Sequence, residues 1–519
     1  LGGKIEANGA NEGSGGKIAT SSPETTLSPN LAVFAKAGVN SNMDSQGSFT
    51  ATATTQHIDT NVAKVISDTI EHSNVTLVAD GGNINLDRDV SIMKQSTSTT
   101  TLLKLSSAGT TSILGSISNN ESTELSVQIA SMSDIRLDST AFIKAAEVSF
   151  VAERDITVLG DIYAYGGKNS PPLAKFMGAN VALLGAVYAG RSDSNSSTVR
   201  INAGKLLSTG AQSRINLLGR DAKLNLTSDH EIVMEGMIQT NAGAGRGGTY
   251  IISAVDDISI MNATITANGH DGGFVRITSS NADVNTHSSI IQTNGSSGRG
   301  GTIEISGFNK TLIQDTTIQS TGATQGGNIY LGNNLNEQTI PFSKYTLIDP
   351  ASIVDTTSDG QGGFVETSGH ILDLLTTINV GRGGIWLIDP YDVTIASSGA
   401  SGTGYSANFS PSTTTTLLAS SIVSSLNSGT NVSITTGSNS ANTLTVNAAI
   451  AKTSGGNATL TLTGGTIDIN AAISSTSNDL NLTLNASTVD IGVDLTLNGG
   501  NLTVNADVTI SADVTITTA

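Results

Sequence analysis

Short runs in which apolar and polar residues alternate recur along the whole chain of 519 residues. Leu480–Leu484 (LNLTL) and Leu502–Val504 (LTV) are two of them. Strict alternation over about four to six positions is the pattern of a β-strand with one buried face. A strand this short cannot bury its apolar face alone, so the pattern predicts many short strands that cover one another.

These runs are organised into repeats marked by Gly-Gly pairs. Four consecutive copies are Ile238–Ser253 (IQTNAGAGRGGTYIIS), Ile265–Ser279, Ile291–Ser306 and Ile318–Gly332. Their Gly-Gly pairs begin at 247, 272, 300 and 326, so the steps are 25, 28 and 26 residues. Each copy is a strand, Asn/Gly turn residues, a Gly-Gly pair and another strand. A nearly constant period of this length is typical of stacked repeats, in which each unit covers the next.

Further copies lie outside this block. Lys4–Ser21 is an N-terminal copy, Leu159–Gly166 (LGDIYAYG) and Leu184–Arg191 (LGAVYAGR) are 25 residues apart, and Val446–Leu462 and Ile469–Leu484 are offset by 23. Short strands joined by Gly and Asn turns at positive φ predict an all-β fold, a parallel β-helix. Helical repeats are disfavoured because Gly and Asn are poor helix formers.

Two segments that resemble each other interrupt the repeats, Val65–Leu77 and Leu418–Ile434. Apolar residues in the second recur at the spacing of one helix face: Leu418, Ile422 and Leu426. Gly429 comes next as a C-terminal stop. Each segment therefore predicts a short amphipathic helix laid on the solenoid.

The predicted organisation has three parts. Residues 1–395 form a β-helical region with Gly-Gly coils and a helical insertion near 62–73. Residues 396–440 form a loop, Ala396–Thr414, followed by the second helix. Residues 441–519 form a second β-helical segment with shorter coils.

Charge and cysteine content narrow the function. Twenty-five basic residues stand against 43 acidic ones, giving a net charge of −18, which argues against nucleic acid as a partner because phosphate neutralisation needs Lys/Arg clusters. The chain has no cysteine, as suits a protein exported unfolded. It begins with Leu1 and not with an initiator Met, so we expect a processed or partial product. The apolar stretch Phe176–Gly190 is too short to span a bilayer and predicts buried strand.

One segment is more elaborate than the repeats, GGFVETSGHILDLLTTINVGRGGIWLIDPYDVTI at Gly362–Ile395. It carries Trp386, the single Trp of the chain. We interpret it as a structural joint between two coil types, in which Trp386 caps or fills the narrow core and Pro ends a strand because it cannot donate to the ladder. The predicted joint residues are Gly362, Gly363, Gly383, Gly384, Trp386, Asp389 and Pro390.

The same segment carries a family likeness. GGFVETSG, followed by a short strand and GGIWLIDPYDVTI, resembles large exoproteins of the filamentous haemagglutinin type, the secreted partners of two-partner secretion systems. Ser424–Ala486 is similar to the segment on the C-terminal side of this motif in that family. The resemblance implies a right-handed parallel β-helix, exported through a dedicated outer-membrane transporter to the surface of a Gram-negative bacterium. The family's N-terminal secretion domain is not recognisable, since Ser28-Pro29-Asn30-Leu31 stands in a different context from its Asn-Pro-Asn motif.

Catalytic and cofactor motifs are weak. Gly243–Gly248 matches GxGxxG, but a strand-like TYIIS comes after it where a dinucleotide site needs a helix. Asp256-Asp257 and Asp87-Arg88-Asp89 are the tempting carboxylate pairs for a glycosidase. Neighbours on a strand point to opposite faces, so Asp256 and Asp257 cannot both face one groove, whereas Asp87 and Asp89 could share a face. We favour solvated turn or edge charges for both clusters. His270-Asp271 lies in a predicted turn. No zinc pattern is present, and we expect no catalytic, cofactor or metal site.

The favoured function is therefore a non-enzymatic shaft of a secreted or cell-surface adhesin, which extends a binding region or forms extracellular fibres. Its expected partners are the transporter during export, a host-cell, cell-surface or polysaccharide receptor, and other copies of the chain through open coil edges. A carbohydrate-active β-helix enzyme of the lyase, glycosidase or tailspike type is the alternative from another class. Capture of haem or a haem carrier, which the family label permits, is a third.

Overall fold

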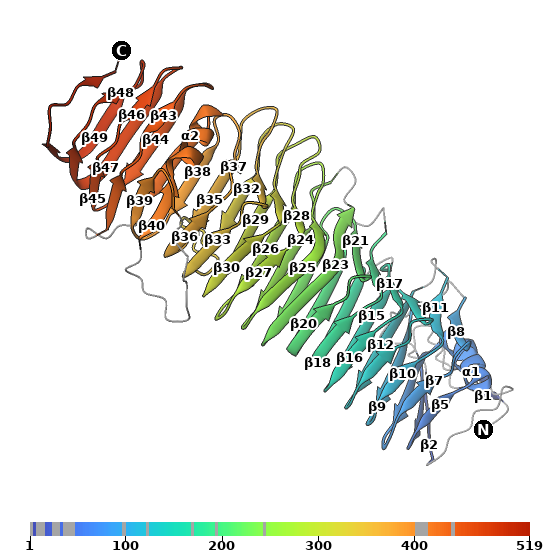
Figure 1. Cartoon of the computed structure of the whole chain (residues 1–519). Helices are drawn as coiled ribbons and strands as arrows, with labels where there is room; N and C mark the ends of the chain where they lie inside the picture. The colour runs from blue at the N-terminus through green and yellow to red at the C-terminus, as the bar shows by residue number, and fades with distance from the viewer. Residues whose placement is uncertain are drawn as a thin grey trace. The chain divides into compact units, whose positions relative to one another are not determined.

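The computed structural model describes residues 4–6, 16–22, 32–34, 47–95, 100–120, 124–167, 171–191, 196–241, 245–399, 414–436 and 442–518. Strands make up 57% and helices 5% of it, so the fold is all-β. The strands of successive turns pair in parallel (Figure 1), which confirms the predicted parallel β-solenoid. The chain divides into two compact units, residues 1–243 and 244–519.

In the first unit each turn contributes strands to three faces. Face 1 consists of β2 (Lys17–Ser21), β4 (Ser48–Ala53), β6 (Asn74–Ala79), β9 (Thr101–Ser107), β12 (Leu125–Ser131), β15 (Glu147–Ala152), β18 (Leu173–Leu183), β20 (Thr198–Thr209) and β22 (Lys223–Ser228). Face 2 consists of β5 (Gln56–Ile58), β7 (Ile84–Leu86), β10 (Thr111–Ile113), β13 (Ile135–Leu137), β16 (Asp155–Val158), the second halves of β18 and β20, and the start of β23 (Glu231–Asn241). Face 3 consists of β8 (Ser91–Lys94), β11 (Ser116–Asn119), β14 (Phe142–Ala145), β17 (Asp161–Ala164), β19 (Ala186–Ala189), β21 (Arg214–Leu218) and the end of β23. Separately, β1 (Lys4–Glu6) pairs with β3 (Ala32–Phe34).

The second unit repeats this plan. Face 1 consists of β24 (Thr249–Ala254), β26 (Phe274–Ser279), β29 (Thr302–Gly307), β32 (Asn328–Leu331), β35 (Phe364–Ser368), β38 (Ile385–Asp389), β41 (Asn431–Thr435), β44 (Ala458–Thr463), β47 (Leu480–Ile491) and β49 (Leu502–Ile510). Face 2 consists of β25 (Ile258–Thr266), β27 (Val284–His287), β30 (Lys310–Gln314), β33 (Tyr345–Ile348), β36 (Ile371–Leu374), β40 (Thr415–Leu418), β39 (Val393–Ala396), β42 (Thr443–Val446), β45 (Thr466–Ile469) and the second halves of β47 and β49. Face 3 consists of the end of β25, β28 (Ile290–Gln292), β31 (Thr317–Gln319), β34 (Ile353–Asp355), β37 (Ile378–Asn379), β43 (Ile450–Lys452), β46 (Ile473–Ser475), β48 (Leu495–Thr496) and β50 (Ile516–Thr517).

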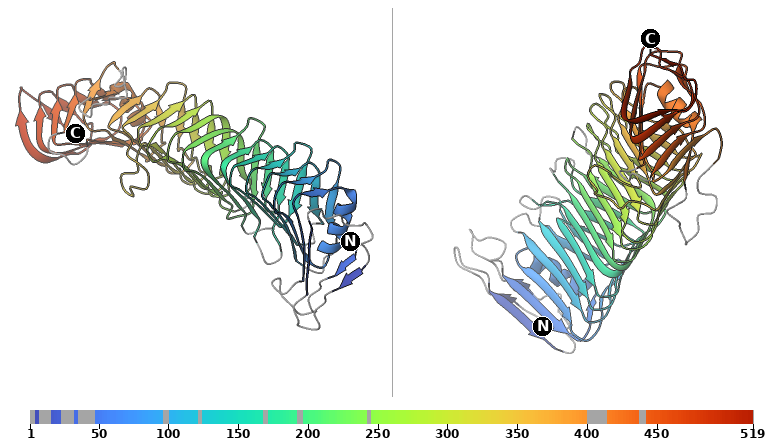
Figure 2. Two further views of the ribbon diagram at one scale, coloured as in Figure 1. Left: turned by 90° about the horizontal axis from the view of Figure 1, so that it is seen from below. Right: turned by 90° about the vertical axis from the view of Figure 1, so that its left-hand side faces the viewer.

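Stacked aliphatic columns form the core of each unit. Alternate residues of the strands point inwards, as strand geometry requires, and Figure 2 shows the strands of each face lying one above the next. One column of the first unit consists of Phe49, Val75, Leu103, Val127, Val148, Ala174, Val199 and Leu224, all buried. Full burial of one such side chain contributes about 1.5–3 kcal/mol, so these columns are the main source of stability.

The strand register of the second unit matches the spacing of the Gly-Gly pairs. Tyr250 pairs with Val275, Val275 with Ile303, and Ile303 with Ile329, which are steps of 25, 28 and 26 residues. The predicted period is therefore the length of one turn. Ile329 pairs next with Val365, 36 residues on, because residues 332–344 leave the solenoid between β32 and β33.

The Gly-Gly pairs have a different physical reason from the one predicted. Turns at positive φ are the expectation, yet neither glycine of the pairs that begin at 247, 272, 300 and 326 has a positive φ, whereas Gly166, Gly383, Gly455 and Gly499 in other pairs do. A Cβ added to Gly301 would lie 2.1 Å from the carbonyl oxygen of Gly273, and one added to Gly327 would lie 2.2 Å from that of Gly301. The second glycine of each pair thus stacks directly on the backbone of the preceding turn. Glycine is required there because the backbones approach too closely for any side chain.

Both predicted helices are present. Helix α1 covers Thr60–Ile70, and the side chain of Asp59 accepts hydrogen bonds from the backbone at its N-terminus. Helix α2 covers Ala419–Asn427, and Gly429 comes after it at φ +79° with its N–H bonded to Leu426 O at 3.0 Å. Helix α1 comes after the face 2 strand β5 and packs against β8, and helix α2 comes after the face 2 strand β40 and packs against β43. In each unit a helix therefore takes the place of one face 3 strand.

Strand β40 is out of order in the second unit. It comes after β39 in sequence, but it pairs with β39 on the edge opposite β42, so it lies on the N-terminal side of β39. Meanwhile β38 pairs with β41 and β39 with β42. Residues 400–413 of the predicted loop lie outside the described residues. The predicted domain boundaries at residues 395 and 440 stay predictions. The pairing of β38 with β41 joins strands on either side of residue 395, and the pairing of β39 with β42 joins strands on either side of residue 440.

Candidate functional site

The predicted joint glycines lie on two successive turns. Phe364 pairs with Ile385, so Gly363 stands next to Gly384, and a Cβ on Gly384 would lie 2.7 Å from Gly363 O. The N–H of Gly362 donates to Arg382 O at 2.9 Å, and the N–H of Gly383 donates to Gly429 O at 2.9 Å. The four glycines thus form one corner of the solenoid. The residues that come directly after α2 stack on this corner, through the hydrogen bond between Gly383 and Gly429.

Trp386 occupies an ordinary core position of face 1. It pairs with Val365 on the preceding turn and with Val432 on the following one, and its side chain is 1% exposed. Its Nε1–H donates to the Thr367 hydroxyl oxygen at 3.1 Å. Such burial leaves the indole no access to a ligand. That the residue marks a joint between two coil types stays a prediction.

Asp389 and Pro390 end β38, as the sequence predicts. Both residues are buried. Burial raises the pKa of Asp389 to about 7, while a hydrogen bond from the Asn333 side chain opposes the rise. Asp389 is therefore a neutral or easily neutralised carboxyl near physiological pH, which sequence patterns do not reveal.

The carboxylate pairs singled out in the sequence lie in turns and bends between strands. Asp87 bonds His57 Nε2 at 2.7 Å, and this hydrogen bond raises the pKa of His57. Asp89 stands in the same turn at φ 62°. Asp257 is exposed and accepts a hydrogen bond from Asp283 N at 3.0 Å. These acids act as turn and edge groups.

His270-Asp271 and the GxGxxG stretch are parts of Gly-Gly corners. Asp271 Oδ1 accepts a hydrogen bond from Arg299 N at 3.0 Å on the following turn, and His270 lies 3.7 Å from Asp271. Gly243 lies outside the described residues, and strand β24 begins directly after Gly248. A strand in that place is incompatible with the dinucleotide fingerprint, which needs a helix.

A different set of carboxylates is buried beneath residues 332–344, here called the strap. Glu304 is 2% and Glu366 0% exposed. Glu304 accepts hydrogen bonds from Asn334 Nδ2 and Thr339 Oγ1, both at 3.1 Å, and from Arg276 Nε. Glu366 accepts one from Leu335 N at 2.9 Å. These two acids therefore fasten the strap to face 1.

Glu366 is buried beneath the strap. Burial raises the pKa of Glu366 to about 7, and the neighbouring Asp389 also raises it. A raised carboxyl pKa is common at catalytic sites. Here, however, the oxygens are occupied by hydrogen bonds from the strap itself and from Ser368 Oγ, at 2.9 Å. The arrangement is that of a structural fastening.

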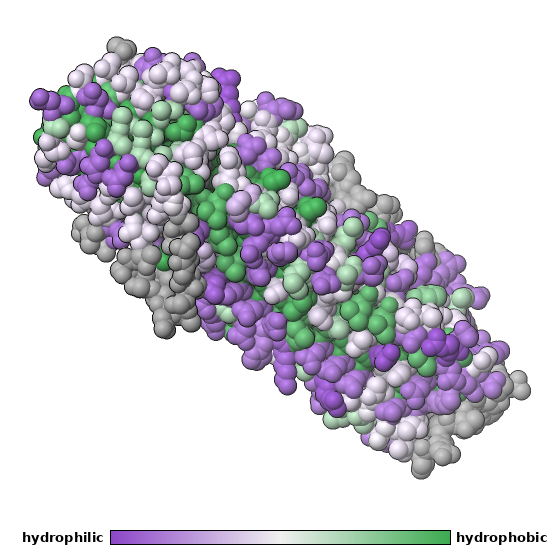
Figure 3. Space-filling model, in the orientation of Figure 1, coloured by the Kyte–Doolittle hydropathy of each residue, from purple (hydrophilic) through white to green (hydrophobic). Residues whose placement is uncertain are grey.

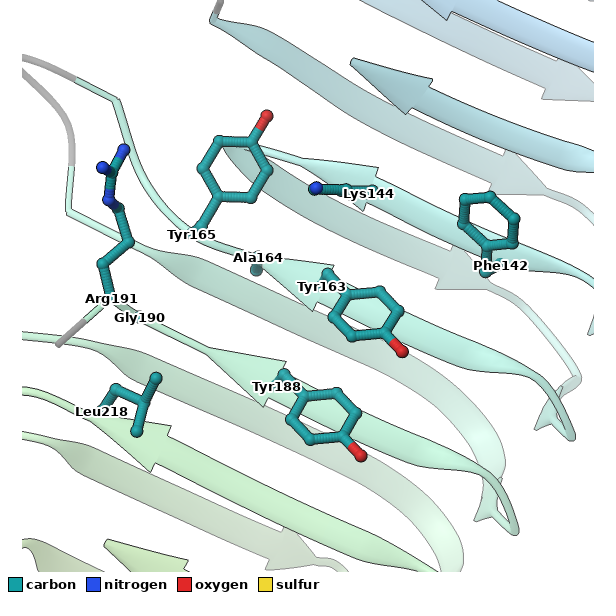
Figure 4. A pocket seen from close by; sticks show the side chains of 9 residues that line it. All are labelled: Phe142, Lys144, Tyr163, Ala164, Tyr165, Tyr188, Gly190, Arg191 and Leu218. Carbon is teal, nitrogen blue, oxygen red and sulfur yellow. The ribbon is translucent and has the colours of Figure 1, made fainter. Parts of the chain in front are cut away.

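An open pocket of about 370 Å³ lies on face 3 of the first unit (Figure 4). Tyr163 and Tyr188 pair in register on β17 and β19, and their rings are parallel, with centroids 4.9 Å apart and 4° between the planes. Tyr165 and Arg191 lie on the other side of Ala164. The other lining residues are Phe142, Lys144, Gly190 and Leu218.

This pocket was not predicted, although its signal is visible in the sequence. LGDIYAYG and LGAVYAGR are the pair of copies found 25 residues apart, and 25 residues separate Tyr163 from Tyr188. A shared Tyr at one position of a repeat predicts stacked rings wherever the repeats are adjacent turns. Burial and the neighbouring Asp161 raise the pKa of Tyr163, so its hydroxyl keeps its proton at neutral pH.

The remaining surface and the comparisons add no assignment. The face of the molecule in Figure 3 is mostly hydrophilic with small, scattered hydrophobic patches. Within the described residues, no group of three or more acidic or His side chains is placed to hold a metal ion, and neither described helix is long and apolar enough to span a membrane. No protein-family model, curated protein or solved structure matches the chain.

Proposed function

We propose that the chain is the non-enzymatic shaft of a secreted or cell-surface adhesin. One observation carries the proposal: face 1 of the second unit is an unbroken ladder from β24 to β49. Every added turn lengthens such a ladder by about 4.8 Å, and the inward side chains serve only the stack. A chain that stacks its turns in this way gains length with every turn, which is what a shaft requires.

The expected partners derive from the sequence resemblance and from charge. The haemagglutinin-like segment at Gly362–Ile395 supports export through an outer-membrane transporter of the two-partner type. A host-cell, cell-surface or polysaccharide receptor and other copies of the chain are the partners of an adhesin or a filament. The net charge of −18 opposes binding to nucleic acid.

Electron microscopy of the chain, together with labelling of the producing cells, tests the proposal. Isolated solenoids or filaments at the cell exterior are the expected result, and filaments built from many copies would assign the chain to fibres. Chain retained inside the cell would contradict the proposal.

The carbohydrate-active enzyme is the alternative, and Glu366 and Asp389 are the observation in its favour, since burial raises the pKa of each to about 7. Both would need the strap to leave face 1 before a glycosidic bond could reach them. Incubation with a panel of polysaccharides separates the two functions. New reducing ends or unsaturated products that disappear in Glu366→Gln would establish the enzyme, and unchanged polysaccharides support the shaft.

A further inference from the structure

We propose that the pocket on face 3 of the first unit binds an acidic sugar, a pyranose that carries a carboxylate. Tyr163 and Tyr188 are its central residues. Their parallel rings are 4.9 Å apart, which is the spacing of adjacent strands, so the backbone ladder itself fixes the pair. Both rings are partly exposed. Rings held in this way are a rigid aromatic surface that loses little conformational entropy on binding.

The pocket is concave and mainly aromatic, which suits the apolar C–H face of a sugar ring. Its volume of about 370 Å³ lies within the range of small-ligand sites. Small residues leave the floor open, since Ala164 and Gly190 stand between the two groups of large side chains (Figure 4). The phenol of Tyr165 is directed elsewhere, because it donates to the Asn119 side chain.

Charge selects an acidic ligand over a neutral one. Lys144 and Arg191 both line the pocket, and none of its nine described lining residues is acidic. Asp161, next to the lining, accepts a hydrogen bond from the Tyr163 hydroxyl at 3.2 Å, so two cations face one carboxylate. Lys144 pairs in register with Tyr163, so the ammonium-bearing side chain, Tyr163 and Tyr188 form one row across β14, β17 and β19. In a chain with a net charge of −18, a local pair of cations complements an anion. Arg is also suited to bidentate contact with a carboxylate.

This binding site goes beyond the proposed function, because a shaft that only projects another region needs no pocket of its own. It also requires no bond-breaking step. Failure of the shaft proposal in microscopy would leave the site untouched, and absence of sugar binding would leave the shaft untouched.

Calorimetry on the full chain, with digalacturonic acid as the acidic probe and lactose as the neutral one, tests the proposal. The expected result is binding of digalacturonic acid that weakens with added salt and exceeds binding of lactose. Tyr188→Ala should weaken it by about tenfold or more, whereas Tyr188→Phe keeps the ring and most of the affinity. Lys144→Gln should reduce the preference for the acid over lactose, since Arg191 remains.

Phe308 and Lys344 provide a matched control. They form a similar aromatic and cationic pair in the second unit, with Lys344 Nζ 4.5 Å from the ring centroid of Phe308, and they line no part of this pocket. Phe308→Ala should therefore leave binding unchanged. Equal loss in Phe308→Ala and Tyr188→Ala, no binding of digalacturonic acid, or equal affinity for lactose would each overturn the proposal. Circular dichroism of Tyr188→Phe and Tyr188→Ala separates lost binding from lost folding.

Discussion

The indole Nε1–H of Trp386 donates a hydrogen bond of 3.1 Å to the hydroxyl oxygen of Thr367 on the preceding turn. The same hydroxyl lies 3.5 Å from Leu387 O, to which it donates. One buried hydroxyl thus satisfies the only polar atom of the largest core side chain. This bond lets an indole occupy a column in which its neighbours on both sides are valines.

Removing this hydroxyl should destabilise the second unit. Thr367→Val keeps the shape of the side chain but leaves a buried indole N–H unpaired, at a cost of about 1–3 kcal/mol. Thr367→Ser, which retains the hydroxyl, should cost less. Trp386 is the single Trp of the chain, so its fluorescence during thermal unfolding reports this region directly. Equal melting temperatures for the Val and Ser variants would show that the hydrogen bond contributes nothing.

The stacked glycines should not tolerate even a methyl group. In Gly301→Ala the new Cβ would lie 2.1 Å from Gly273 O, so the two turns must separate and ladder hydrogen bonds must weaken. We expect a loss of more than about 2 kcal/mol or failure to fold. Gly204 is the control, because its Cβ would meet nothing closer than 3.7 Å. Gly204→Ala should be neutral or slightly stabilising, as measured by urea unfolding.

The strap should be more stable at acidic than at alkaline pH. Glu366 and Asp389 each have a pKa raised to about 7, so the folded state binds more protons than the unfolded state between about pH 4 and 7. Their contribution to stability is therefore complete below about pH 4 and is lost as the pH rises through 7. The change is up to about 3 kcal/mol for Glu366 alone.

Hydrogen exchange of the Leu335 amide, which bonds Glu366 at 2.9 Å, measures this change locally after correction for the intrinsic rate. Its protection should be greater at pH 5 than at pH 8, and Glu366→Gln should reduce the difference. Glu337 lies exposed on the strap, so Glu337→Gln should leave the pH dependence as it is. A wild-type protection factor independent of pH would refute the prediction.

Removal of one complete turn should be tolerated. Phe274 pairs with Thr302, so deletion of residues 274–301 joins Gly273 to Thr302 and brings equivalent positions together. Because solenoid stability is approximately a sum over neighbouring turns, we expect a folded, slightly less stable chain with an unchanged circular dichroism spectrum per residue. Deletion of residues 274–287 removes part of a turn, breaks the register and should prevent folding of this region.

Sequence patterns predicted those features that depend on neighbours along the chain. Alternation predicted strands, and the Gly-Gly spacing predicted the lengths of turns. The i, i+4 spacing in Leu418–Ile434 predicted the second helix, and the likeness of Val65–Leu77 to that segment predicted the first. The place of Gly-Gly in each turn was visible, but its cause was not, because the close approach of Gly273 and Gly301 joins residues 28 positions apart. The stacking order of β40 before β39 could not be predicted from the sequence, because either order buries the same residues of each strand.

The sequence by itself determined that this protein is a stack of short parallel strands around an aliphatic core. The reason is physical: no strand of four to six residues can bury its apolar face except against a similar neighbour. The tertiary structure alone decided which outward residues meet. The alternation of apolar and polar residues does not determine the identity of outward residues such as Tyr163 and Glu366. Only the register between turns places Tyr163 beside Tyr188 and Glu366 beneath the strap.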